Sequence, residues 1–136
     1  MKKRIYVFES DPIYRAYFAV HVGGTRAQAL QWFGKKINLP PTSEDIREAE
    51  QGQSNGTIFT VRGLLSFAIW LREVPEKPTA NILGTIAHEA LHATWHVLHT
   101  VGIENITEDS EEAFCYYHAY LVREIAARLW PETREP

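Results

Sequence analysis

The chain has 136 residues, of which 45% are hydrophobic and 23% are charged, and its formal net charge is −3. These values are typical of one soluble globular domain spanning residues 1–136, and they exclude a disordered or collagen-like chain. The small net charge excludes a strongly basic surface field, so we expect no nucleic-acid partner. The single cysteine, Cys115, excludes an internal disulfide and cysteine-rich zinc sites.

We expect neither export nor membrane insertion. The richest apolar run covers residues 63–71 and is bounded by Arg62 and Arg72, whereas a helix needs ~20 apolar residues to cross a bilayer. The basic residues at positions 2–4 precede only a short apolar run before Glu9, which is too little for a signal peptide. The expected location is therefore the cytoplasm.

Two strands are predicted at the start of the chain. Apolar side chains alternate over residues 14–22, which is the period of a half-buried strand, and residues 5–8 supply a partner strand. Asp11 and the proline after it predict the turn between the two strands. Gly23 and the glycine after it end the second strand.

A helix and a polar stretch follow. Thr25 and Gln28 have the spacing of a capping box, and apolar residues at helical spacing extend the helix to about Ile37. Residues 44–49 fit either one short helix or an irregular segment, and residues 52–56 are predicted to be a loop.

The second half of the chain predicts two further strands and two long helices. The strands cover residues 57–61 and 65–73, since aromatic and branched residues alternate with polar or small ones. One helix begins near residues 79–81 and ends at about Val101, and the other begins after Ser110 and ends at about Trp130. The expected fold is α+β, with a small mixed or antiparallel sheet of three to four strands packed against helices.

The first long helix carries the pattern HExxH as His88-Glu89-Ala90-Leu91-His92. A spacing of four residues brings both imidazoles onto one helix face, close enough to ligate one metal ion. Glu89 then lies beside the metal, where its carboxylate can act as a general base toward water. The opposite face carries apolar residues at helical spacing, so we expect the helix to bury its back and expose the histidines.

A third protein ligand is expected from the second long helix. His96 lies about 12 Å along the axis from His88, which is too far to share a metal with it on a straight helix. The extension HExxHxxGxxH is absent, because Trp95 and Leu98 occupy the glycine and histidine positions. Three candidates remain on the second helix: Glu111, Glu112 and His118.

These residues resemble a known group. HEALH on one helix, with the acidic pair Glu111 and Glu112 opening the next, resembles the minimal gluzincin-type zincins, and especially small metallopeptidase-like proteins encoded by phages and prophages. The resemblance covers residues 65–120 and implies that Glu112 is the third zinc ligand, with Cys115 as the small residue three positions later. Tyr116 departs from the family pattern, which has Asp or Asn there in many members.

The helical phase gives a different ranking from the resemblance. Glu111 lies on the stripe of residues formed by Phe114, His118, Val122, Ile125 and Leu129, whereas Glu112 lies roughly 100° away. His118 is an alternative ligand or an oxyanion donor, although a hydrogen-bonded interior histidine is the commoner role. Tyr116 is a further candidate for an oxyanion or substrate contact.

Several neighbouring residues have simpler interpretations. His96 and His99 are interpreted as solvated positions flanking the motif, and Cys115 as a small core residue. Trp95, on the histidine face, is expected to form a wall of the cleft. Gly84, one turn before His88, leaves room for close backbone approach.

The sequence predicts a zinc-dependent peptidase with Zn²⁺ held by His88, His92 and Glu112, and with Glu89 as the general base. Its partner is a protein or peptide substrate. The strand over residues 65–73 is expected to be the sheet edge that pairs with this substrate, as in zincins. The alternative hypothesis is an inactive zincin-like module in which zinc joins the two helices and the domain serves assembly or regulation.

Overall fold

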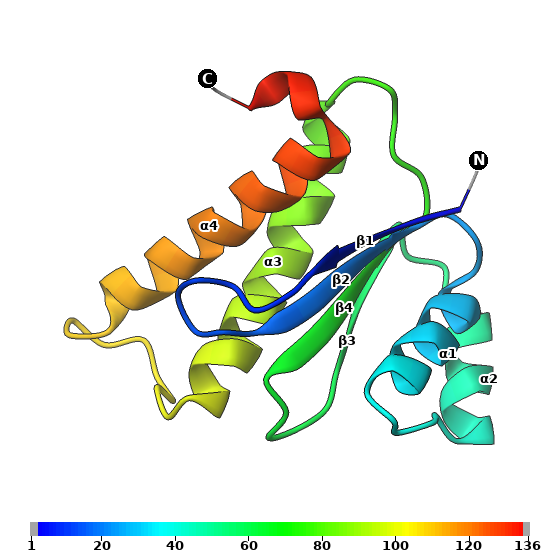
Figure 1. Cartoon of the computed structure of the whole chain (residues 1–136), viewed down its shortest axis with the longest axis horizontal. Coiled ribbons are helices and arrows are strands. Elements are labelled where there is room, and N and C mark those ends of the chain that lie inside the picture. Colours follow the sequence, from blue (N-terminus) through cyan, green and yellow to red (C-terminus); the bar gives the residue numbers. More distant parts are fainter. Residues whose placement is uncertain (1–2, 135–136) are drawn as a thin grey trace.

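The computed structural model describes residues 3–134, and Figure 1 shows a central sheet with helices on both faces. In chain order the elements are β1 (Arg4–Phe8), β2 (Tyr17–Val22), α1 (Arg26–Lys36), α2 (Ser43–Gln51), β3 (Gly56–Thr60), β4 (Ser66–Leu71), α3 (Ala80–Thr100), α4 (Glu111–Leu129) and the short 3₁₀ helix η1 (Pro131–Thr133). The α+β class and the four strands agree with the sequence prediction.

The four strands form one mixed sheet in the order β1-β2-β4-β3. β1 pairs with β2 and β3 pairs with β4, both antiparallel, whereas β2 and β4 run parallel in the centre. The prediction that the strand over residues 65–73 is an edge is therefore wrong: β4 has a hydrogen-bonded neighbour on each side. The short turn at Gly63 folds β3 back beside β4, so the edge next to α3 is β3.

One face of the sheet packs against α3 and α4 and forms the main core. Phe18, Val20 and Val22 of β2 lie beside Phe67, Ile69 and Leu71 of β4, and all six are at most 1% exposed. The helices add the apolar back of α3, as predicted, with Ile82, Ile86, Ala90, Ala93 and Val97. This contiguous core fixes the position of α3 and therefore of its histidines.

An aromatic row crosses this face of the sheet. The rings of Phe8 and Phe18 stack with centroids 4.4 Å apart, and those of Phe18 and Phe67 stack at 4.7 Å. The three residues are aligned across β1, β2 and β4, so cross-strand pairing places their side chains together. The guanidinium of Arg128 covers the outer ring, 4.6 Å from its centroid.

The opposite face is covered by α1 and α2, which lie together on the other side of the sheet in Figure 1. Ala19 and His21 of β2 and Ala68 and Trp70 of β4 point to this side, and each is at most 3% exposed. The expectation that the strand over residues 14–22 is half-buried is therefore wrong for β2, because helices cover both faces of the sheet.

Threonine caps begin α1, α2 and α3, and those of α1 and α3 lie at the predicted helix starts. Thr25 and Gln28 form the expected capping box of α1, and Thr42 forms a second one with Asp45 at α2. This second box explains why residues 44–49 adopt the helical option. Thr79 accepts a hydrogen bond from the backbone N–H of Ile82 at the start of α3.

The loop between β1 and β2 is held by a buried carboxylate. Oδ1 of Asp11 accepts from the N–H groups of Ile13 and Tyr14, and Oδ2 accepts from the N–H of Ala16 and the hydroxyl of Tyr117 at 2.9 Å. This turn occupies positions that were predicted to belong to the second strand, which therefore begins at Tyr17 instead of position 14. The bond to Tyr117 also ties the loop to α4.

α4 buries a somewhat different stripe from the predicted one. Phe114, Tyr117, Leu121, Ile125 and Leu129 are its buried residues. Val122 and His118 are half-buried. Cys115 is exposed, so its interpretation as a core residue is wrong. Within residues 3–134, no helix combines the length and the apolar character required to cross a bilayer.

Candidate metal and catalytic site

The two histidines of HExxH project together from the exposed face of α3. Their Nε2 atoms lie 3.3 Å apart, and the ring centroids are 4.9 Å apart. Both residues are exposed, while Ile86 and Ala90 behind them are fully buried. The helix repeat and the apolar back of α3 therefore produce the predicted outward-facing pair.

The separation of the two nitrogens fits a shared zinc ion. Two imidazole nitrogens that each bind one tetrahedral zinc at about 2.0–2.1 Å are about 3.3–3.4 Å apart. The observed distance between the Nε2 atoms of His88 and His92 is 3.3 Å. Without a metal, the same distance allows one ring N–H to donate to the other ring. The donor type and spacing of these two residues thus suit zinc.

Glu89 lies beside this pair but is turned into the protein. Its residue is 6% exposed, and its Oε1 is 4.0 Å from Nε2 of His88. Burial raises the pKa of the Glu89 carboxyl, and the neighbouring His88 and His92 partly oppose that rise. A carboxylate with a raised pKa next to a polar opening has the properties of a general base.

The edge strand β3 runs along the side of α3 that carries the motif. At one end, Ser54, Asn55 and Gly56 share a hollow with α3 residues, which include Gly84, Thr85, His88 and Glu89. At the other end, Thr60, Arg62 and Gly63 share a second hollow with Trp95, His96, His99 and Thr100. Along α3, His92 lies between the residues of the two hollows. The histidine pair therefore lies beside the length of an open strand edge.

The backbone of this edge is available for strand pairing. The N–H of Arg72 donates to the carbonyl of Asn55 at 2.9 Å, which makes these two residues a hydrogen-bonded pair of the antiparallel ladder. Because such pairs alternate, Thr57 and Phe59 also direct their backbone groups to β4. Gly56, Ile58 and Thr60 direct theirs toward the free edge.

The structure does not bring a third ligand to the histidine pair. Among residues 3–134, no group of three or more His, Cys, Asp or Glu side chains is placed to hold a metal ion. Glu111 and Glu112 are both exposed in the first turn of α4. His118 donates from Nε2 to the carbonyl of Ala87 at 2.9 Å, which agrees with the expected role of a hydrogen-bonded interior histidine.

The faces of α4 separate the two glutamates. Phe114 contacts Trp95 with ring centroids 4.9 Å apart, and His118 bonds to Ala87, so both face α3. Glu111 precedes them by three and seven residues and shares their face. Glu112 instead shares a face with Tyr116, which is 68% exposed. The packing therefore supports the helical phase, which favours Glu111, over the family pattern, which implies Glu112.

The remaining sequence candidates have mixed outcomes. Trp95 is 39% exposed and lines the second hollow, as expected for a cleft wall. His99 is exposed as expected. His96 is not a solvated position, because its Nε2 donates to the carbonyl of Leu64 at 2.7 Å and joins α3 to the turn after β3. A Cβ at Gly84 would meet nothing within 4 Å, which agrees with open space on this side.

Sequence reasoning missed two parts of this region. It assigned the edge to the wrong strand; the short connection at Arg62 and Gly63 was the signal that could have indicated pairing of residues 57–61 with the strand over residues 65–73. It also missed Asn55 and Gly56 as neighbours of the motif. A Cβ at Gly56 would lie 2.8 Å from Cγ2 of Thr85, so the glycine permits close approach of β3 and α3.

The fold and the site define the class of the molecule as an α+β domain with an exposed HExxH helix beside a free antiparallel strand edge. Comparison with family models, with curated proteins and with solved structures found no match.

Proposed function

We propose that this protein is a zinc-dependent peptidase that hydrolyses a dedicated protein substrate in the cytoplasm. The observation that carries the proposal is the pair of Nε2 atoms 3.3 Å apart, beside a buried carboxylate. His88 and His92 supply two zinc ligands, and one glutamate of the acidic pair at the start of α4, Glu111 or Glu112, would have to turn toward them to supply the third. The resemblance of these residues to minimal gluzincins of phages and prophages supports the same reaction class.

The free edge of β3 supports a peptide as the substrate. An extended chain that pairs with Gly56, Ile58 and Thr60 obtains its alignment from backbone hydrogen bonds, independently of its side chains. The hollow shared by Gly56, His88 and Glu89 then lies next to the paired peptide. Since β3 and α3 are fixed by the sheet and the core, the peptide is oriented without a large rearrangement.

When bound, zinc supplies Lewis acidity, which lowers the pKa of water and polarises a carbonyl group. The carboxylate of Glu89 accepts a proton from the attacking water and delivers it to the leaving amine. Its burial favours this role, because the raised pKa makes the carboxylate a better proton acceptor. Tyr116 and His118 remain candidates for donors to the oxyanion, and His118 would first have to release the Ala87 carbonyl.

Metal analysis and a single catalytic variant test this proposal together. The purified protein is expected to bind one equivalent of zinc, and changing both His88 and His92 to alanine is expected to abolish binding. Glu89→Gln is expected to retain zinc but to lose hydrolysis of the substrate by at least about a hundredfold. Substrate hydrolysis is followed by mass spectrometry of a candidate protein substrate. Unchanged hydrolysis in Glu89→Gln would exclude Glu89 as the general base, whereas a function of the protein that persists in this variant without any hydrolysis would favour the inactive binding module.

A second pair of variants identifies the third ligand. We expect either Glu111→Gln or Glu112→Gln to weaken zinc binding, by about ten- to a hundredfold, with the other close to the unchanged protein. The face shared with Phe114 and His118 supports Glu111, whereas the family resemblance implies Glu112. Zinc affinity measured by competition with a fluorescent chelator separates the two. Equal affinities in all three proteins would exclude both glutamates.

A further inference from the structure

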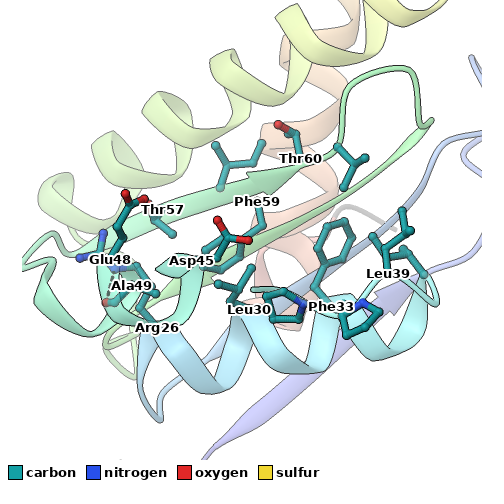
Figure 2. A pocket seen from close by; sticks show the side chains of 16 residues that line it. Arg26, Leu30, Phe33, Leu39, Asp45, Glu48, Ala49, Thr57, Phe59 and Thr60 are labelled. Carbon is teal, nitrogen blue, oxygen red and sulfur yellow. Dashed lines mark hydrogen bonds between the residues drawn. The ribbon is translucent and has the colours of Figure 1, made fainter. Parts of the chain in front are cut away.

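A second groove borders β3 on the side of the sheet away from α3. It lies between α1, α2 and the edge strand and has a volume of about 450 Å³. Figure 2 shows its side chains gathered from these three elements. Apolar groups of Leu30, Phe33, Ile37, Leu39, Phe59 and Val61 line much of it.

The packing of α1 and α2 forms this groove before any ligand is present. A Cβ at Gly34 would lie 2.6 Å from Cδ of Pro41 and 2.9 Å from the carbonyl of Leu39, so the glycine lets this segment close onto α1. Nε of Arg26 donates to the carbonyl of Ala49, and its Nη1 donates to Ser54. These bonds join α1 to α2 and to the loop before β3, and a preformed groove lowers the entropic cost of binding.

The groove shares the free edge of β3 with the candidate site. Thr57 and Phe59 point their side chains to the groove, because they pair with Trp70 and Ala68, whose side chains face α1 and α2. Ile58, between them, packs against the core on the α3 side. Side chains of an added strand alternate in the same way. A peptide paired with β3 therefore presents alternate residues to the groove and to the histidine site.

The two ends of the groove differ in charge. Asp45 and Glu48 of α2 are both exposed; in Figure 2, Glu48 lies at the end near Thr57 and Asp45 nearer the middle, while Phe33 and Leu39 lie at the other end. Arg26 also lines the acidic end, but two of its nitrogens donate to Ala49 and Ser54. Arg26 keeps its positive charge but is half-buried, whereas the carboxylates of Asp45 and Glu48 are exposed, so two carboxylates outweigh one guanidinium and complement a lysine or arginine side chain.

We propose that this groove is the specificity subsite for an extended peptide that pairs with the edge of β3. One large apolar side chain of the peptide lies beside Phe33 and Phe59, and a basic side chain two residues away lies beside Asp45 and Glu48. That the peptide is a substrate rests on the proposed peptidase function, whereas its binding does not. The groove thus selects a segment containing Leu or Phe and, two positions away, Lys or Arg.

Labelled synthetic peptides test the proposal directly. The probes are fluorescein-labelled nonapeptides with a serine-rich background and a central Leu-x-Lys or Lys-x-Leu, and their binding is measured by fluorescence anisotropy. We expect one order of the two residues to bind best, because antiparallel pairing of the peptide with β3 is slightly more stable than parallel pairing. Replacing the leucine by serine is expected to weaken binding about tenfold, and replacing the lysine by aspartate about three- to tenfold. Equal binding by all of these peptides overturns the proposal.

Matched protein variants locate the binding site. Glu48→Lys is expected to weaken the best peptide about three- to fivefold, whereas Glu50→Lys, the same charge change on α2 outside the groove lining, leaves affinity unchanged. Leu39→Asp is expected to weaken it about tenfold, and Ile106→Asp, at an exposed apolar residue in the loop after α3, leaves it unchanged. Equal losses in groove and control variants overturn the proposal.

One further variant tests whether the peptide pairs with the edge of β3. Thr60→Pro removes an outward N–H without removing a bond to β4, so the fold is expected to tolerate it, while peptide affinity falls about tenfold. Thr60→Ala is the control and retains affinity. If Thr60→Pro instead dissociates a dimer of the protein, as seen by analytical ultracentrifugation, the edge pairs with a second copy and the proposal is overturned.

Repeating the titrations in EDTA separates this inference from the peptidase proposal. We expect the peptide preferences to persist without metal, because no groove residue is a candidate ligand. If the peptide preferences persist in EDTA but no peptide is hydrolysed when zinc is present, the peptidase function is contradicted and the groove is supported as a peptide-binding site. If the substrate is hydrolysed equally well by the Leu39 and Glu48 variants, the peptidase proposal is supported and the proposed role of the groove as a specificity subsite is overturned.

Discussion

The two faces of the sheet use different kinds of packing. The face toward α3 and α4 buries large aromatic and branched residues in one contiguous core, whose members include Phe18, Phe67 and Ile86 at 0% exposure. The face toward α1 and α2 has small central residues, Ala19 and Ala68, beside the buried His21, and it borders an open groove.

This difference assigns different roles to the two faces. The α3 side positions HExxH on a helix that the core holds rigidly, as the proposed peptidase function requires. The α1 side leaves space beside the edge strand, where a ligand can bind without disturbing the main core. The strand edge of β3 is the element that both sides share.

The largest expected effect is on the free energy of unfolding, when a phenylalanine is replaced by alanine on each face of the sheet in turn. Phe67→Ala removes a ring stacked on Phe18 in the main core, and it is expected to lower the free energy of unfolding by about 4 kcal/mol. Phe33→Ala is expected to cost less, about 3 kcal/mol, because the ring is buried at 2% exposure but borders the groove, so its neighbours have space to relax. Urea denaturation of both variants measures the difference. Equal losses of unfolding free energy in the two variants would contradict the difference in packing between the two faces of the sheet.

Zinc is expected to stabilise the outer side of α3, which the core does not touch. At a free zinc concentration of 100 times the dissociation constant, ligand linkage predicts about 2.7 kcal/mol of added stability. The combined change of His88 and His92 to alanine is expected to remove this zinc-dependent gain. His99→Ala is the control on the same helix and is expected to retain it. Thermal unfolding with zinc and with EDTA provides the measurement, and a gain that persists in the double variant places the metal elsewhere.

A smaller effect is expected where α4 holds the loop between β1 and β2. Tyr117→Phe removes the hydroxyl that donates to Oδ2 of Asp11, and it is expected to cost about 1–2 kcal/mol. Burial and the neighbouring carboxylate raise the pKa of Tyr117, so the hydroxyl keeps its proton and stays a donor. Tyr120→Phe is the control. If denaturant unfolding gives the same free energy of unfolding for the two variants, the hydrogen bond between Tyr117 and Asp11 does not contribute measurably to stability.

The smallest expected effect is a pH dependence on the α1 side. Burial, and to a lesser degree the charge of Lys3, lowers the pKa of His21 below its ordinary value, and neither ring nitrogen has a hydrogen-bond partner within residues 3–134. The folded state therefore favours the neutral ring. Its contribution to stability is complete above the unfolded pKa of about 6.5 and declines as the pH falls below that value.

His21→Phe tests this pH dependence. The variant keeps an aromatic ring beside Trp32 but has no titrating group, so its stability is expected to fall less than that of the unchanged protein between pH 7 and about pH 5. Denaturation midpoints across this range measure the two slopes. Identical slopes would show that His21 does not contribute to the acid sensitivity of the α1 face.

Local patterns in the sequence predicted the elements well, and they predicted less about the contacts between elements. The capping box at Thr25, the apolar back of α3 and the spacing of His88 and His92 depend on neighbours within one or two helical turns. The bond between Asp11 and Tyr117 joins residues 106 positions apart in the chain, and no local pattern indicates it. For the same reason, Cys115 could not be assigned to the surface until the packing of α4 was known.

The sequence by itself determined the α+β class, the order of the helices and strands, and the exposed histidine pair with its glutamate, since the helical period of 3.6 residues and the strand period of two residues are local patterns. Only the tertiary structure decided that β3 is the edge, that helices cover both faces of the sheet, and that Glu111 shares the α4 face directed to α3. Each of these depends on which surfaces meet after the chain folds back on itself. Hydrophobic burial drives that step, and its outcome depends on the shapes of distant segments together.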